Sequence, residues 1–174
     1  MLDDLENIDK ASQEEYLSII SAETDRLSRL ISNVLDFQKI SAGKMQWNDC
    51  YVDIVEVISD CVKPFKISVE SKGLEFICEC DEDELKTVID GDRLAQVVYN
   101  LLSNSLKFTE DGFIKVSLKK LKTVDGESFR LSVSDSGPGM AEDQLEKIFQ
   151  PYEQIQGSTN MGKGTGLGLY ITSC

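Results

Sequence analysis

Four polar side chains recur along one predicted helix so that they share a face: Gln96, Asn100, Asn104 and Lys107. Steps of four, four and three residues bring them to the same side of an α-helix. The opposite side is apolar and contains Leu94, Val97, Val98, Leu101 and Leu102. Such a helix has to lie between a core and a polar surface. Three carboxamides beside an ammonium group suit a phosphorylated ligand that carries a metal.

The stripe has a second interpretation, because a helix that simply faces water also has a polar outer side. Composition constrains the choice of ligand. The chain has 174 residues and a formal net charge of −13, which argues against nucleic acid or an anionic membrane surface as the main partner. The same charge repels free ATP at long range, so a nucleotide site would need a cation nearby.

Location and cysteine content point to a reducing compartment. No segment has the apolar length of a membrane span, and the opening MLDDLENIDK lacks the basic and apolar regions of a signal peptide. We therefore expect a cytoplasmic chain. The five cysteines form no C-x-x-C pair, and no histidine is present to complete a zinc site. Most of the cysteines are expected to be small core residues.

A long helix is predicted from about Ser12 to Gly43, where apolar residues recur in steps of three and four. Ser12 and Glu15 form a capping box, and Gly43 is placed to end the helix. The apolar stripe needs either a partner helix or a surface of its own domain, and both remain open.

The rest of the chain reads as mixed α/β. A helix is expected from near Asp53 to residues 72–73, and Pro64 should kink or divide it. The striped helix begins near Asp92. Alternating patterns predict strands over 74–80, 85–89, 114–118 and 129–133, with a hairpin turn at 125–126.

The last predicted strand ends in a carboxylate at an inward position. Phe129, Leu131 and Val133 alternate, and the same period of two brings Asp135 to the inward face. A buried acid needs a hydrogen-bonding partner. The turn at residues 137–139, Gly-Pro-Gly, would let a ligand approach the backbone closely. Asp135 therefore either accepts the exocyclic amine of adenine or is satisfied by backbone amides of the turn.

Alternate glycines form a second unusual segment, at Gly162, Gly164, Gly166 and Gly168. They allow consecutive amides to converge on phosphate oxygens, and helical spacing resumes after them. Residues 157–163 also read G-x-x-x-x-G-K, but Gly164 replaces the required Ser or Thr, and no apolar strand precedes. A Walker-type P-loop is therefore excluded.

In this order, four segments closely resemble the N, G1, F and G2 boxes of sensor histidine kinases of two-component systems. They are N-L-L-S-N-S-L-K-F-T at 100–109, D-S-G-P-G at 135–139, I-F-Q-P-Y-E-Q at 148–154 and G-K-G-T-G-L-G-L at 162–169. Residues 21–45 resemble the second helix of the family's dimerisation and phosphoacceptor hairpin. The resemblance implies two parts: this helix in 1–46, and an ATP-binding catalytic domain in 47–174. The expected fold is α+β, an α/β sandwich of the Bergerat type with a mixed sheet and helices on one face.

The resemblance also implies residue roles. Asn104 would coordinate Mg²⁺, Asn100 and Lys107 would lie near the phosphates, and Asp135 would accept the adenine amine. Gly137 and Gly139 would line the base site. The segment that closes over the phosphates would consist of Gly162, Lys163, Gly164, Thr165, Gly166, Leu167 and Gly168.

Residues 141–161 would form a mobile lid that Phe149 packs down. Many family members have an arginine near the position of Gln154 that reaches the terminal phosphate. Its absence here leaves Lys163 as the candidate cation, so the expected catalytic set is Asn100, Lys107 and Lys163.

This chain departs from the family in having no histidine, so the phosphoacceptor and its helix are missing. We expect a piece, truncated at both ends, of a larger kinase that is either wholly cytoplasmic or a membrane-bound sensor of which this chain is in the cytoplasmic part. The implied partners are ATP, the histidine-bearing hairpin helix, a response-regulator receiver domain and a second copy bound through the N-terminal helix.

The residue at position 100 helps to distinguish hydrolysis of ATP from transfer of its phosphate. Bergerat-type ATPases of the Hsp90, gyrase B and MutL families have a glutamate there as general base for water, whereas the carboxamide of Asn100 cannot accept a proton. Transfer of the γ-phosphate to a protein side chain is therefore favoured over hydrolysis. Two alternatives remain: a non-catalytic nucleotide-binding or dimerising module, and an anti-sigma-factor-type serine kinase, against which the leading helix argues.

Overall fold

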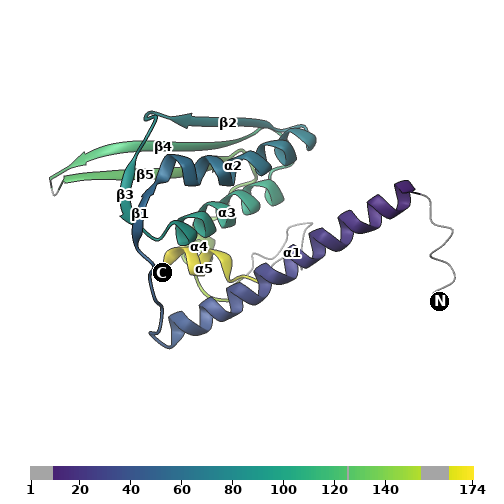
Figure 1. The fold of residues 1–174 in the computed structure, drawn as a ribbon, viewed down its shortest axis with the longest axis horizontal. Coiled ribbons are helices and arrows are strands. Elements are labelled where there is room, and N and C mark those ends of the chain that lie inside the picture. Colours follow the sequence, from purple (N-terminus) through teal and green to yellow (C-terminus); the bar gives the residue numbers. More distant parts are fainter. Residues whose placement is uncertain (1–9, 125, 154–164) are drawn as a thin grey trace. The chain divides into compact units, whose positions relative to one another are not determined.

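The computed structural model describes residues 10–124, 126–153 and 165–174, and the chain divides into two compact units, Met1–Met45 and Gln46–Cys174. The described part of the first unit is one helix, α1 (Lys10–Ser41), drawn in purple and blue in Figure 1. This helix already includes Lys10, so the predicted Ser12–Glu15 capping box is wrong. Lysine and alanine at positions 10 and 11 are strong helix formers, which explains why the helix does not start at Ser12.

Helix α1 ends as predicted at Gly43, whose φ is 63°. The Gly43 amide donates to the Ile40 carbonyl at 2.9 Å, and the Lys44 amide donates to the Lys39 carbonyl at 2.9 Å. This pair of bonds is a Schellman motif, which favours glycine in the left-handed region. Several large apolar side chains along the helix are exposed, among them Tyr16, Ile20, Leu27 and Ile31.

The second unit has an α/β architecture whose strands form two sheets. Its elements are β1 (Cys50–Asp53), α2 (Ile54–Ser71), β2 (Glu75–Cys80), β3 (Lys86–Ile89), α3 (Gly91–Phe108), β4 (Phe113–Thr123), β5 (Gly126–Asp135), α4 (Glu142–Leu145) and α5 (Gly168–Ser173). Strand β4 pairs parallel with β2 and antiparallel with β5, and β1 pairs antiparallel with β3 in a separate sheet. Helices α2 and α3 lie side by side over one face of the three-stranded sheet (Figure 1). The predicted fold class is confirmed, although the strands are divided between two sheets.

The core lies between these helices and strand β4. It contains Ile54, Ile58, Val62, Phe65 and Val69 from α2, Leu94, Val98 and Leu102 from α3, and Ile114, Val116 and Leu118 from β4. The apolar face predicted for the striped helix is therefore the buried one. The expectation for the cysteines is wrong, because Cys50, Cys78, Cys80 and Cys174 are exposed and Cys61 is only partly buried. Cys78 and Cys80 lie on β2, which pairs only with β4 in the part of the chain that the structure describes.

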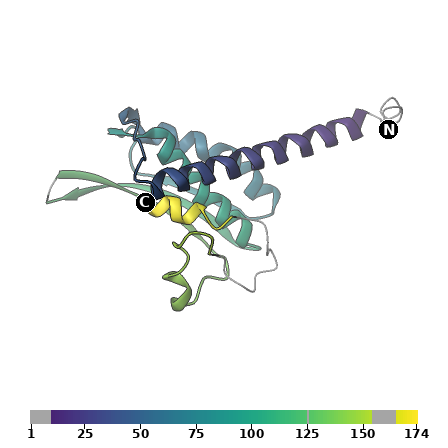
Figure 2. The same cartoon turned by 90° about the horizontal axis from the view of Figure 1, so that it is seen from below.

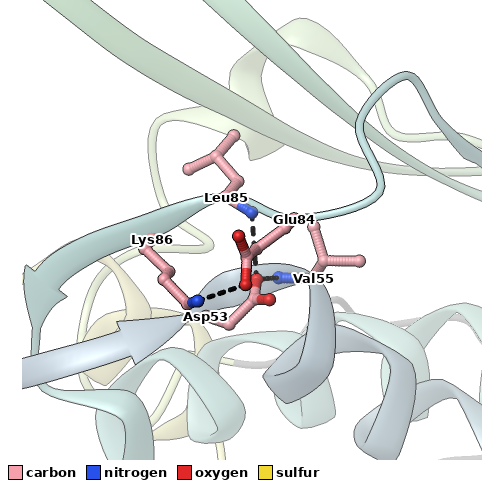
Figure 3. A network of polar contacts seen from close by, with 5 residues as sticks. All are labelled: Asp53, Val55, Glu84, Leu85 and Lys86. Atoms are coloured by element: carbon pink, nitrogen blue, oxygen red, sulfur yellow. Dashed lines mark hydrogen bonds and ion pairs between the residues drawn. The ribbon is translucent and has the colours of Figure 1, made fainter.

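Strand β1 is not predicted by the sequence, which indicates a helix that begins near Asp53. One carboxylate explains its placement (Figure 3). Asp53 is the N-cap of α2, and its Oδ1 accepts hydrogen bonds from the amides of Val55 and Leu85, both at 3.0 Å. Lys86, the first residue of β3, is ion-paired with Glu84 beside it. A single side chain thus joins the end of β1, the start of α2 and the segment that enters β3.

Helix α2 runs without interruption through Pro64, so of the two predicted effects, a kink or a division, the division is wrong. Asp60 and Pro64 are both exposed, so the carbonyl that loses its amide donor can be hydrated. The helix ends in a second Schellman motif at Gly73, whose φ is 80°. The adjacent Lys72 ammonium donates to the carbonyls of Leu106 at 2.9 Å and Thr109 at 2.6 Å, and so caps the C-terminal end of α3.

Candidate functional site

Helix α3 presents the polar stripe, and its N-terminal end is firmly fixed. The Asp90 carboxylate caps the helix through the Arg93 amide at 3.1 Å and also accepts the Asn48 amide at 2.9 Å. The hydrogen bond from the Asn48 backbone, followed by that from Arg93, holds the pKa of the buried Asp90 carboxyl below its ordinary value of 3.8. All four stripe side chains, from Gln96 to Lys107, are half-buried.

Asp135 is the last residue of β5 and lies opposite the buried Ile114 of β4. Its Oδ1 accepts the Gly137 amide at 3.0 Å, and its Oδ2 accepts the Ser105 hydroxyl of α3 at 2.9 Å. Asp135 itself is exposed, so the expectation of a buried acid is wrong. The reason is that β5 lies at the edge of its sheet among the described strands and that Asp135 stands at its end. The carboxylate accepts one hydrogen bond from a backbone amide of the turn, which agrees in part with the interpretation that the turn satisfies it. Its remaining lone pairs are available to a ligand.

The turn after Asp135 leaves little room for a side chain at Gly137 while the Asp135 carboxylate keeps its position. A Cβ there would lie 2.8 Å from Asp135 Oδ1 and 3.4 Å from the Phe108 carbonyl oxygen. Gly139 has a φ of 69°, which also favours glycine. Close by, the fully buried hydroxyl of Thr109 has no hydrogen-bond partner within the described segments. The site therefore combines close backbone approach with unused polar groups.

The second glycine segment is described from Thr165 onward, so Gly162, Lys163 and Gly164 lie outside the described residues. Gly166 has a φ of 69°, and a Cβ on it would lie 2.7 Å from the Glu153 carbonyl oxygen. Leu167 is fully buried, and Gly168 begins α5. Figure 2 shows α5 in yellow, and this helix contacts α3.

Asn100 makes that contact. Its Nδ2 donates to the Gly168 carbonyl at 3.2 Å and to the Thr172 hydroxyl at 3.4 Å. A Cβ on Gly168 would lie 3.3 Å from Asn100 Oδ1, so a side chain there would require the Asn100 carboxamide to shift by a few tenths of an ångström. The amide group of Asn100 is thus engaged by α5, while its oxygen remains available.

The other stripe residues differ in their surroundings. The Asn104 carboxamide has no hydrogen-bond partner in the part of the chain that the structure describes. Lys107 Nζ lies 4.6 Å from the centroid of the Phe108 ring, and Gln96 Oε1 accepts from Arg93 Nη1 at 2.7 Å. An unengaged, half-buried carboxamide oxygen suits Mg²⁺, which takes few protein ligands and completes its shell with phosphates and water.

The lid prediction is only partly covered by the structure. Helix α4 lies within it, and residues 154–161 are outside the described residues. Phe149 is 46% exposed, so the packing expected of it is not observed. Within the described ranges, no helix is long and apolar enough to cross a membrane.

Two family models match the chain. Residues 89–173 match the histidine kinase-, DNA gyrase B- and HSP90-like ATPase model, and residues 1–43 match the His Kinase A phosphoacceptor domain. The chain is 33% identical over 169 residues to hybrid signal transduction histidine kinase D of Dictyostelium discoideum, covering 95% of this chain and 11% of that protein. It is 34% identical over 166 residues to the aerobic respiration control sensor protein ArcB of Escherichia coli K12, covering 93% and 21%. The chain therefore spans about a tenth to a fifth of the length of these relatives.

Solved structures of histidine kinases are also similar to this chain. Full-length ShkA in complex with AMPPNP superposes with a TM-score of 0.72 and 30% identity, covering 97% of this chain and 35% of that one. The nucleotide-free catalytic domain of histidine kinase ThkA gives a TM-score of 0.60 and 31% identity, covering 73% and 78%. ThkA in complex with the response regulator protein TrrA gives 0.59 and 28%, covering 84% and 42%. These matches favour neither the regulatory module nor the serine kinase. The chain belongs to the histidine kinase family and carries the ATP-binding domain and part of the phosphoacceptor region of that family.

Proposed function

We propose that this chain binds ATP and Mg²⁺ beside α3 and supplies the catalytic half of phosphotransfer to a histidine on another helix. One observation carries the proposal: α3 is bonded to both glycine-containing segments. Ser105 holds Asp135 at the first segment, and Asn100 holds Gly168 at the second. Three motifs that are far apart in sequence thus meet on one helix.

The nucleotide would bind between these contacts. Asp135 would accept the adenine amine beside Gly137 and Gly139, and residues 162–168 would close over the phosphates. Asn104 would coordinate Mg²⁺ through its unengaged carboxamide oxygen. The metal would neutralise phosphate charge, which a chain with a net charge of −13 otherwise repels.

The reaction would be an in-line phosphoryl transfer. A histidine nitrogen on another polypeptide segment would form a bond to the γ-phosphorus, and the bond from that phosphorus to the bridging oxygen would break to release ADP. Asn100 would orient the phosphates, and the Lys107 ammonium would neutralise part of their charge. The Asn100 carboxamide cannot accept a proton from water, so transfer to a side chain is favoured over hydrolysis. Lys163 remains the proposed cation at the terminal phosphate.

We also propose the partners of this reaction. The exposed apolar side chains of α1 would pack against the histidine-bearing hairpin helix and against a second copy of the chain. A response-regulator receiver domain would accept the phosphoryl group on an aspartate. We also predict that the chain is located in the cytoplasm.

Base selectivity tests the proposed site. Asp135→Asn should weaken ATP binding by roughly 1.5–3 kcal/mol, the value of a hydrogen bond to a charged group, and leave the fold intact. GTP should bind poorly to the unaltered chain, because guanine presents a carbonyl where adenine presents an amine. Titration calorimetry with both nucleotides measures both effects. Equal affinities for ATP and GTP would contradict the assignment of Asp135.

A further inference from the structure

We propose that Ser105 is a positioning residue that orients the Asp135 carboxylate and thereby sets selectivity for the adenine amine. The inference rests on the proposed function and extends it to a residue that the sequence patterns did not single out. The Ser105 hydroxyl lies 2.9 Å from Asp135 Oδ2, although 30 positions separate the two residues. An ionised carboxylate only accepts hydrogen bonds, so the serine hydroxyl is the donor.

The donor is held rigidly. Ser105 is only 5% exposed and lies in the last turn of α3, where its own carbonyl accepts the Thr109 amide at 2.9 Å. The Lys72 ammonium fixes the same end of the helix through the Leu106 and Thr109 carbonyls. The hydroxyl is therefore attached to an anchored element rather than to a loop.

Two donors from two different elements then define the plane of the carboxylate. Gly137 of the turn donates to Oδ1, and Ser105 of α3 donates to Oδ2. Each oxygen keeps a lone pair for an incoming amine. Without Ser105, the exposed Asp135 side chain would be held on one oxygen only and would have to be ordered again when the ligand binds.

The Ser105–Asp135 hydrogen bond should contribute little to folding stability. Its effect on the orientation of the carboxylate can therefore be measured without unfolding the chain. Asp135 is exposed, so water can replace the serine hydroxyl on Oδ2. Ser105→Ala removes the buried hydroxyl itself and therefore leaves no unpaired donor behind. Alanine is also the better helix former at this position. The variant should fold with unchanged or slightly raised thermal stability.

The experiment compares Ser105→Ala with Ser103→Ala in the full chain. Ser103 lies on the same helix, but its hydroxyl donates to the Asn100 carbonyl at 3.2 Å. Binding is measured for ATP and for purine riboside triphosphate, which lacks the exocyclic amine. Ser105→Ala should weaken ATP roughly three- to tenfold, as expected for loss of preorganisation, and leave the amine-free nucleotide unchanged. Ser103→Ala should change neither.

Other results overturn the inference. An equal loss for both nucleotides would mean a general disturbance of the site, and unchanged ATP affinity would mean that Ser105 does not act through Asp135. The proposed function has a separate test, since it fails if the unaltered chain binds no ATP or if Asp135→Asn binds ATP normally. An effect of Asp135→Asn without an effect of Ser105→Ala would refute the role of Ser105 alone.

Discussion

Two carboxamides one helical turn apart on α3 have different surroundings. Asn100 is bonded to α5, whereas Asn104 has no hydrogen-bond partner within the described residues. Both are half-buried, so the difference is not one of exposure. At the residue scale, this makes Asn104 the stripe carboxamide that is free to meet a metal ion without breaking an existing bond.

Asn104→Ala should therefore abolish most of the dependence of ATP binding on magnesium. Hard divalent cations prefer oxygen ligands, and the variant removes the one proposed to come from the protein. The measurement is the ratio of ATP dissociation constants with Mg²⁺ and with a chelator. Gln96→Ala is the matched control, because this stripe carboxamide is already bonded by Arg93. If the ratio is the same in Asn104→Ala as in the unaltered chain, the metal role is refuted.

At the scale of elements, α3 is held by its two ends and contacts both glycine segments between them. Asp90 caps the start of the helix and ties it to Asn48, and Lys72 caps its end. The elements that carry the candidate site are thus fixed by charged groups at the termini of one helix.

Asp90→Ala should destabilise the chain by about 0.5–2 kcal/mol at neutral pH, the usual effect of losing an N-cap. Because the folded-state pKa of Asp90 is lowered, its contribution is present above the ordinary pKa and is lost as the pH falls through the folded value. The difference in unfolding free energy between the unaltered chain and the variant should therefore shrink as the pH is lowered from about 7 toward 3.

Denaturant unfolding followed by the fluorescence of Trp47, the sole tryptophan, measures this difference. Asp92→Ala provides the control. Asp92 is an exposed carboxylate in the first turn of the same helix, and the cap is Asp90 rather than Asp92. A difference for Asp90→Ala that stays constant with pH would show that the carboxylate charge is not responsible.

At the scale of the whole molecule, the chain carries a proposed nucleotide site but no histidine. We expect that radiolabelled ATP leaves no acid-labile label on this chain, because phosphohistidine requires an imidazole nucleophile. Adding the hairpin helix with its histidine as a separate polypeptide should place label on that polypeptide. Replacing the added histidine should abolish the label. Stable label on serine or threonine of the chain alone would instead support a serine kinase.

Local sequence patterns were sufficient to predict many of the secondary-structure elements of this protein. The sequence by itself determined that α3 is amphipathic, that α1 ends at Gly43, and that β4 and β5 form a hairpin, because helical period, alternation and turn glycines act over a few residues. The ordered motifs also identified Asp135 and Asn104 as candidates. By contrast, β1 was not predicted, because it is only four residues long and its last residue, Asp53, is also the N-cap of α2 and indicated the start of a helix.

Only the tertiary structure decided how the candidate residues meet. The Ser105–Asp135 and Asn100–Gly168 bonds join positions 30 and 68 residues apart, and no local pattern specifies such pairs. Exposure is likewise a property of the assembled fold: Asp135 has the phase of an inward residue, yet it lies at the end of β5, at the edge of the sheet among the described strands. Pro64 keeps its helix intact because the carbonyl it leaves unbonded is on an exposed turn. Periodicity determines which face a side chain takes, whereas packing determines what covers that face.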